Sequence, residues 1–343
     1  MTTYKLSSNE NPFPPLPGVE EAAAAALARM NRYPDAGSTA LYAALAARLG
    51  VSTEQLVAGT GSVAVLYHLV QAFCDPGDRV VHAWRSFEAY PIAIGVNAAV
   101  GVPVPLTADG RHDLTAMADA AAEPGTKVVV LCTPNNPTGP ALTHAEVVGF
   151  LARVPRDVLV VVDEAYREFV RLDGAVDGVA LLAEHPNVVV LRTFAKAYGL
   201  AGLRVGYAAA HRDVAAAVRV CALPFGVSAP AQAAAVAALE HEDELMARVE
   251  AIVAERERVV AALTGAGWEL PETHGNFVWL PAGRRTSDLV TAADEAGIVL
   301  RPFAGDGPLS GVRATIGEPE ANDRLVEVAA RFAPASTGEP SGP

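Results

Sequence analysis

The sequence predicts an α/β protein in which a mostly parallel sheet carries helices on both faces, with a smaller α+β domain after it. Short apolar runs without polar alternation recur along the first part of the chain, as expected for strands buried on both faces. Helical patterns separate these runs, which is the order of a sheet built by right-handed crossovers. The 343 residues, 51% of them hydrophobic, suffice to bury such a core.

The elements of the predicted sheet follow in order along the chain. An extended polar arm (2–17) leads into an alanine-rich helix that ends near residue 30, before the helix-breaking Pro34 and Gly37. Periodicity predicts further helices over 39–49, 63–73 and 144–153, and strands over 55–58, 79–82, 127–132, 158–162, 187–191 and 203–208.

The pattern changes after residue 232. It predicts one long helix over 231–263, followed by strands at 275–280, 299–301 and 312–316 and a helix at 287–296. We therefore expect four segments: an arm and first helix that belong to the small domain (1–30), a large domain (31–232), a C-terminal small domain (233–334) and a disordered tail rich in Ser, Gly and Pro (335–343).

Charge and cysteine content exclude several classes of protein. Lys and Arg number 26 against 39 Asp and Glu, a net charge of −13 that argues against nucleic acid or an anionic membrane as the main partner. Cys74, Cys132 and Cys221 lie far apart, so neither a disulfide framework nor a metal site is expected. The first residues form no apolar signal core, and we expect a soluble, cytoplasmic protein.

Polar side chains follow the predicted strands directly. Because the carboxyl ends of parallel strands meet at one edge, where open α/β sheets bind ligands, we expect these side chains to share a crevice. A tight turn at 59–62 opens a helix and should lie at the same edge. The strand-end residues are Asn136, Asp163, Tyr166, Thr193, Lys196 and Arg204.

This set of groups has a definite chemistry. A helix N-terminus with an arginine beside it suits a phosphate. A lysine among apolar neighbours can have a lowered pKa and form a Schiff base with a carbonyl. A carboxylate at a strand end can pair with a protonated heterocyclic nitrogen. Pyridoxal phosphate requires all three parts.

Three motifs carry a resemblance to a known family. They are Asp-Glu-Ala-Tyr at 163–166, the segment around Lys196 at 193–207, and Asn-Asn-Pro-Thr-Gly at 135–139. Together they resemble the fold-type I aminotransferases, and most strongly the histidinol-phosphate aminotransferase family. The segment 84–91 is similar to an actinobacterial branch described as aromatic-amino-acid (phenylalanine) aminotransferases. The likeness runs from residue 6 to residue 317.

The resemblance implies roles for individual residues. Lys196 would form the Schiff base with the cofactor and, once substrate displaces it, move a proton at the substrate's Cα. Asp163 would pair with the pyridine nitrogen, while Asn136 and Tyr166 would hydrogen-bond the ring's phenolic oxygen. The other implied cofactor contacts are Phe87 stacked on the ring, the backbone of Ser62 and Val63 with Thr193 and Arg204 on the phosphate, and Tyr33 from a partner subunit. The implied substrate contacts are Arg313 on the α-carboxylate, Arg301 on the distal group and Asn9 in the arm.

One departure from the family pattern affects the cofactor. The family usually has serine two residues after Thr193, where this chain has Ala195. One phosphate hydroxyl is therefore missing, and we expect a lower affinity for the cofactor.

The expected activity is a ping-pong transfer of an amino group from an L-amino acid, preferably aromatic, to a 2-oxo acid such as 2-oxoglutarate. A histidinol-phosphate aminotransferase is the first alternative, and a decarboxylase on the same fold is the second. Few Lys or Arg residues flank Arg301, which favours the aromatic donor over the phosphate-bearing one. Because Tyr33 and the arm would serve a neighbour, we expect a homodimer with shared active sites.

Overall fold

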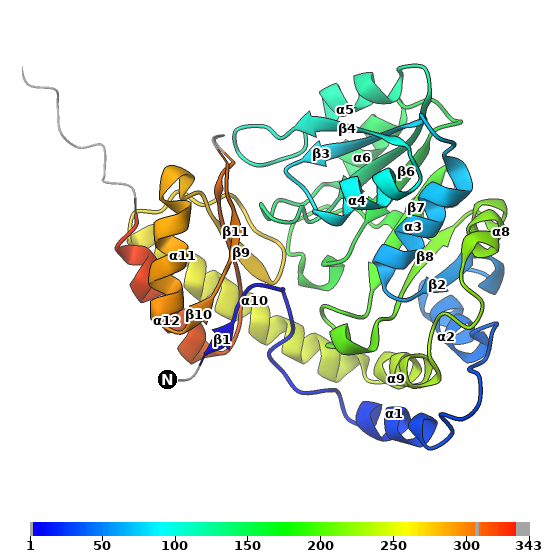
Figure 1. The fold of residues 1–343 in the computed structure, drawn as a ribbon, viewed down its shortest axis with the longest axis horizontal. Helices are drawn as coiled ribbons and strands as arrows, with labels where there is room; N and C mark the ends of the chain where they lie inside the picture. The colour runs from blue at the N-terminus through cyan, green and yellow to red at the C-terminus, as the bar shows by residue number, and fades with distance from the viewer. Residues whose placement is uncertain (1–2, 306–308, 334–343) are drawn as a thin grey trace, which may run out of the picture.

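The computed structural model describes residues 3–305 and 309–333, which form two lobes, and the long helix α10 (Glu242–Gly265) runs from one lobe into the other (Figure 1). One lobe holds the large sheet, and the other holds two small sheets with α11 (Thr286–Glu295) and α12 (Pro319–Ala330). The predicted tail, 335–343, lies outside the described residues, and the predicted domain boundaries stay a prediction.

The large sheet has seven strands in the order β2-β8-β7-β6-β5-β3-β4. β8 pairs antiparallel with both of its neighbours, and the other pairings are parallel, so the expectation of a mostly parallel sheet is confirmed. The strands are β2 (Leu56–Gly59), β3 (Arg79–Trp84), β4 (Val100–Pro105), β5 (Thr126–Cys132), β6 (Leu159–Asp163), β7 (Val188–Thr193) and β8 (Gly206–Ala210).

Alternate residues of the central strands enter two separate cores. Val128 and Val130 of β5 belong to one cluster, whereas Val129 and Leu131 belong to the other. Because successive side chains of a strand point to opposite faces, both faces are covered by helices, which is why these strands are apolar throughout. One face packs on α3 (Ser62–Phe73), α4 (Ala89–Val96) and α8 (Arg212–Cys221), and the other on α2 (Thr39–Leu49), α5 (Leu114–Ala121), α6 (His144–Leu151), α7 (Gly178–Leu181) and α9 (Ala229–Leu239).

The N-terminal arm joins the second lobe of its own chain. β1 (Tyr4–Lys5) pairs in parallel with β10 (Ile298–Val299). Beside it lies an antiparallel sheet in the order β11-β12-β9, formed by β9 (Phe277–Leu280), β11 (Arg301–Phe303) and β12 (Gly311–Thr315). The first helix, α1 (Val19–Leu27), packs instead against α9 of the first lobe.

Three predicted elements were wrong in detail. The single helix expected over 231–263 is two helices, α9 and α10, which are separated at His241, and the acidic first turn of α10 marks a new helix N-terminus. The strand expected at 299–301 is split between β10 and β11, which belong to different sheets. The buried Leu300 lies between them and connects the two strands. The strand expected from 203 begins only at Gly206, since Arg204 adopts a left-handed φ of 55° after a turn of 3-10 helix.

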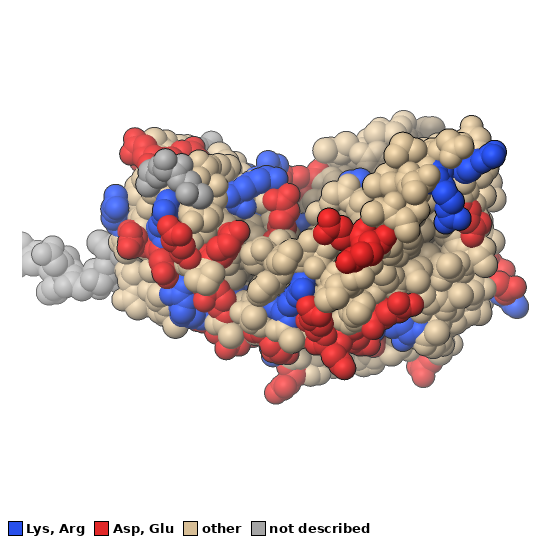
Figure 2. Space-filling model, turned by 90° about the horizontal axis from the view of Figure 1, so that it is seen from below, with Lys and Arg blue, Asp and Glu red and all other residues tan. Residues whose placement is uncertain are grey.

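Figure 2 shows acidic and basic side chains interleaved over one face of the molecule. Within residues 3–305 and 309–333, no helix has the length and apolar character needed to cross a bilayer.

Candidate active site

A cavity of about 290 Å³ lies at the carboxyl ends of β5, β6 and β7, between the two lobes. Every predicted site residue except Tyr33 and Asn9 lines it. The sheet register explains this convergence, because Asp163 at the end of β6 pairs with Cys132 of β5, and Thr193 at the end of β7 pairs with Gly206. The predicted residues in the lining are Ser62, Val63, Phe87, Asn136, Asp163, Tyr166, Thr193, Lys196, Arg204, Arg301 and Arg313.

Asp163 is a buried carboxylate with one satisfied oxygen. Its Oδ2 accepts a hydrogen bond of 2.8 Å from the hydroxyl of Tyr90, a buried residue of α4. Its Oδ1 is buried and has no hydrogen-bond partner among the described residues. Desolvation raises the pKa of Asp163 to about 6, although the Tyr90 hydroxyl opposes this shift. A cationic donor placed at Oδ1 would restore the charged form.

Lys196 points its amine toward the N-terminal arm. Nζ donates to the backbone carbonyl oxygens of Ser8, at 3.0 Å, and Asn9, at 3.2 Å. Burial, and then the nearby charge of Arg313, lower the pKa of Lys196 to about 7. A large share of the amine is therefore neutral and nucleophilic near neutral pH.

A cradle for an anion forms where α3 begins. The helix has Gly61 (φ 84°) at its N-cap, and no side chain caps it among the described residues. The Arg204 guanidinium lies so close to Gly61 that a Cβ there would collide with it. Thr193 Oγ1 accepts the Ala195 N–H at 3.1 Å, which leaves the hydroxyl hydrogen available as a donor. A helix N-terminus, an arginine and a hydroxyl together suit a phosphate.

Arg313 projects from β12 into the cavity and is almost fully buried. It donates to Asn136 Oδ1 and, at 2.6 Å, to the backbone oxygen of Ser7. The rings of Phe277 and Phe303 lie 5.7 Å and 5.8 Å from its guanidinium carbon. A planar guanidinium in this setting can bind a carboxylate through two parallel hydrogen bonds.

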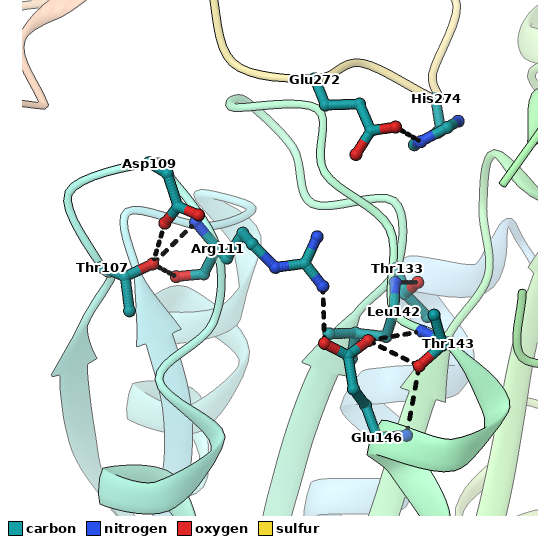
Figure 3. A network of polar contacts seen from close by, with 9 residues as sticks. All are labelled: Thr107, Asp109, Arg111, Thr133, Leu142, Thr143, Glu146, Glu272 and His274. Carbon is teal, nitrogen blue, oxygen red and sulfur yellow. Dashed lines mark hydrogen bonds and ion pairs between the residues drawn. The ribbon is translucent and has the colours of Figure 1, made fainter.

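The loop that carries Asn136 is anchored on both sides (Figure 3). Thr133 Oγ1 accepts the Leu142 N–H at 2.9 Å. Glu146, which closes a capping box with Thr143, also forms an ion pair of 2.7 Å with Arg111. These contacts fix the loop before and after the residues that face the cavity.

Two predicted site residues lie outside the lining. Asn9 is fully buried behind it, where its Nδ2 donates to Tyr166 Oη at 3.0 Å. Asn9 therefore orients Tyr166. Tyr33 is 83% exposed and stacks on Phe225 with ring centroids 4.7 Å apart. Its predicted role, which requires a second subunit, stays a prediction.

Sequence reasoning missed three contributors to the site. Tyr90, Glu88 and the carbonyl oxygen of Ser8 all contact predicted residues. Tyr90 and Glu88 lie one to three residues after Phe87, so their position next to a predicted cofactor contact was the available signal. A backbone carbonyl leaves no signal in the sequence.

The residues present fit pyridoxal phosphate. The unpartnered Oδ1 of Asp163 can receive a protonated ring nitrogen, and the cradle at Gly61 and Arg204 can receive the phosphate. Lys196, with its lowered pKa, supplies the amine that the aldehyde requires.

Comparisons with known proteins agree with this geometry. Residues 2–328 match the family described as aminotransferase class I and II. The aromatic amino acid aminotransferase of Streptomyces avermitilis is 58% identical over 96% of this chain and 90% of its own length, and that of Rhodococcus jostii is 54% identical over 95% and 89%. The structure of histidinol-phosphate aminotransferase from Sinorhizobium meliloti in complex with pyridoxal-5'-phosphate superposes with a TM-score of 0.89 at 28% identity, covering 96% of this chain and 91% of that one.

Proposed function

We propose, from the premise that this chain belongs to the class I and II aminotransferases and is a pyridoxal-phosphate-dependent transaminase, that it moves the amino group of an aromatic L-amino acid to a 2-oxo acid such as 2-oxoglutarate. The choice of an aromatic donor rests on one observation. The chain is 58% identical, over nearly its full length, to an aromatic amino acid aminotransferase. The aromatic side chain of Phe303 in the cavity lining supports this choice, because it offers an apolar surface to a ring.

Each residue of the site has a task in this reaction. When bound, pyridoxal phosphate supplies an aldehyde for the amino group and a ring that withdraws electrons. Asp163 would hold a proton at the ring nitrogen through its unpartnered oxygen. Lys196 Nζ would take the proton from the substrate's Cα and would deliver it to C4′ of the cofactor. Its pKa of about 7 suits both directions at neutral pH.

The substrate would be oriented from the second lobe. Arg313 would bind the α-carboxylate. Its hydrogen bonds to Asn136 Oδ1 and to the backbone oxygen of Ser7 hold the guanidinium in place. Tyr166, oriented by Asn9, would hydrogen-bond the phenolic oxygen of the cofactor. Placing both partners at fixed positions reduces the entropy that must be lost in the transition state.

Histidinol phosphate is the alternative donor. The superposition with the Sinorhizobium meliloti enzyme and the presence of Arg301 in the lining favour it. The two donors differ chemically, since histidinol phosphate carries a CH2–O–phosphate arm in place of the α-carboxylate, and its side chain is an imidazole.

A panel of amino donors decides between them. We expect kcat/KM with phenylalanine or tyrosine to exceed that with histidinol phosphate, with 2-oxoglutarate as acceptor and parallel lines in double-reciprocal plots. A preference for histidinol phosphate would reverse the assignment. Release of carbon dioxide without a need for an acceptor would identify a decarboxylase instead.

The proposed enzyme is a homodimer. Tyr33 stacks on the exposed Phe225, and the segments that carry these two residues expose further apolar side chains, Met30, Val220 and Leu223. A second copy could cover them while Tyr33 reaches the neighbouring cavity. Sedimentation of an active monomer would contradict this proposal. A cytoplasmic location likewise stays a prediction.

A further inference from the structure

An ion pair joins the two lobes in the wall of the cavity. Arg301 Nη2 and Nε donate to Glu88 Oε2 at 2.6 Å and 3.2 Å. Glu88 precedes α4 in the first lobe, and Arg301 opens β11 in the second. Their side chains are 43% and 47% exposed, yet both line the cavity. The pair therefore lies at the mouth of the cavity.

Arg301 and Arg313 face the same side of their small sheet. They stand directly opposite each other on the antiparallel strands β11 and β12, and such partners project from one face. Arg313 is only 7% exposed, so it is the inner cation and Arg301 is the outer one. Two cations on one face attract anions, and the Glu88 carboxylate neutralises the outer cation.

The two arginines can contact opposite ends of a substrate. A substrate whose carboxylate is on Arg313 and whose amino group reaches Lys196 leaves its side chain to the rest of the lining. An uncharged aromatic side chain leaves the ion pair intact. A distal phosphate or carboxylate can use Arg301 only by displacing Glu88, and it then lies beside a charge of its own sign.

We propose that Glu88 is a specificity-determining residue, which occupies Arg301 and thereby disfavours substrates with an anionic distal group, the acceptor 2-oxoglutarate included, relative to aromatic ones. This inference rests on the proposed function. It predicts that neutralising Glu88 opens the site to anionic side chains without improving the binding of aromatic ones.

Glu88→Gln in the holoenzyme tests the inference, because it removes the charge and keeps the shape. The donor half-reaction is followed spectroscopically, with phenylalanine and with glutamate, whose side chain ends in a carboxylate. We expect kcat/KM for glutamate to rise about tenfold and that for phenylalanine to change less than about twofold. Calorimetry with maleate, a dicarboxylate without an amino group, gives a readout independent of turnover, and its Kd should fall about fivefold.

Two controls make the result specific. Glu244→Gln is the matched change, since Glu244 is 42% exposed and pairs with Arg248 on α10, away from the cavity, and it should alter neither donor's kinetics nor maleate binding. In an Arg301→Met background, Glu88→Gln should no longer improve maleate binding.

An unchanged donor ratio and an unchanged maleate Kd in Glu88→Gln would overturn the inference, as would an equal gain in the Arg301→Met background. A wild-type holoenzyme that converts no aromatic donor would instead refute the proposed function, and the maleate titration would still test the role of the ion pair.

Discussion

The hydroxyl of Tyr90 donates a hydrogen bond of 2.8 Å to Oδ2 of Asp163, while Oδ1 of the same carboxylate is buried and unpartnered among the described residues. The two side chains come from different elements, α4 and β6, and both are buried. One oxygen is thus held by the protein and the other is directed to a ligand. The hydrogen bond also lowers the pKa of Asp163 against the opposing effect of burial.

Tyr90→Phe should weaken cofactor binding. Among residues 3–305 and 309–333, the Tyr90 hydroxyl is the one side-chain donor to the Asp163 carboxylate, so its removal raises the pKa of Asp163 further and makes the charged form scarcer. A hydrogen bond to a charged group contributes about 1.5–3 kcal/mol, so we expect the Kd for pyridoxal phosphate to rise at least about tenfold. Fluorescence titration of the cofactor-free protein measures it.

Tyr42→Phe is the control for that experiment. It likewise removes a hydrogen-bonded tyrosine hydroxyl, in this case one that accepts the Ala58 N–H at 3.0 Å, but Tyr42 lies outside the cavity lining. The Kd should stay within about twofold of the wild type. An equal loss in both variants would show that Tyr90 acts only through stability.

Asp163→Asn should stabilise the cofactor-free protein at neutral and alkaline pH. The pKa of Asp163 is raised from 3.8 to about 6, so the native state binds its proton more tightly than the unfolded state does. The corresponding stability is present below pH 4 and is lost as the pH rises to 6, which amounts to about 3 kcal/mol. Asparagine carries no charge, so its advantage should be largest above pH 6 and vanish toward pH 4.

Urea unfolding of the cofactor-free wild type and Asp163→Asn between pH 4 and pH 8 measures this difference. The same variant should bind pyridoxal phosphate more weakly, since it loses the partner of the ring nitrogen. A stability difference that stays constant with pH would contradict the assignment of the raised pKa to this carboxyl group.

Ala195→Ser should strengthen cofactor binding. Ala195 lines the cavity next to Thr193, and a serine there would add a hydroxyl donor beside the cradle at the start of α3. One additional hydrogen bond to a charged phosphate predicts a Kd about tenfold lower. Ala195→Cys is the control, because a thiol has similar size but donates only weakly. Equal affinities of the serine and alanine forms for pyridoxal phosphate would show that the phosphate does not bind beside residue 195.

The central strands could be predicted from the sequence because both of their faces are buried. The edge strand β4 could not, since its side chains are largely exposed and it contains Pro103 and Pro105, which edge strands tolerate. The antiparallel direction of β8 also leaves no mark in an apolar run of five residues. Its start at Gly206 depends on the left-handed Arg204, a tertiary feature.

The same contrast holds within the site. Lys196, Asp163 and Arg204 lie in local motifs after strands, and the sheet topology alone brings them together. Tyr90 lies in the apolar segment 89–96, and nothing in that segment distinguishes it from an ordinary core residue. Its partner Asp163 is 73 residues away, so only the packing of α4 on the sheet brings the two together.

Arg313→Lys should reduce kcat/KM for an aromatic donor about a hundredfold. A lysine keeps the charge but cannot donate in parallel to both carboxylate oxygens, and it loses the guanidinium contacts with Phe277 and Phe303. If Arg313 binds the α-carboxylate in the ground state, KM rises more than kcat falls. Steady-state kinetics with phenylalanine separates the two constants. Arg153→Lys, on the surface in an ion pair with Asp119, is the matched control and should leave both unchanged. If Arg313→Lys retained the wild-type kcat/KM, the substrate carboxylate would have to bind elsewhere in the cavity.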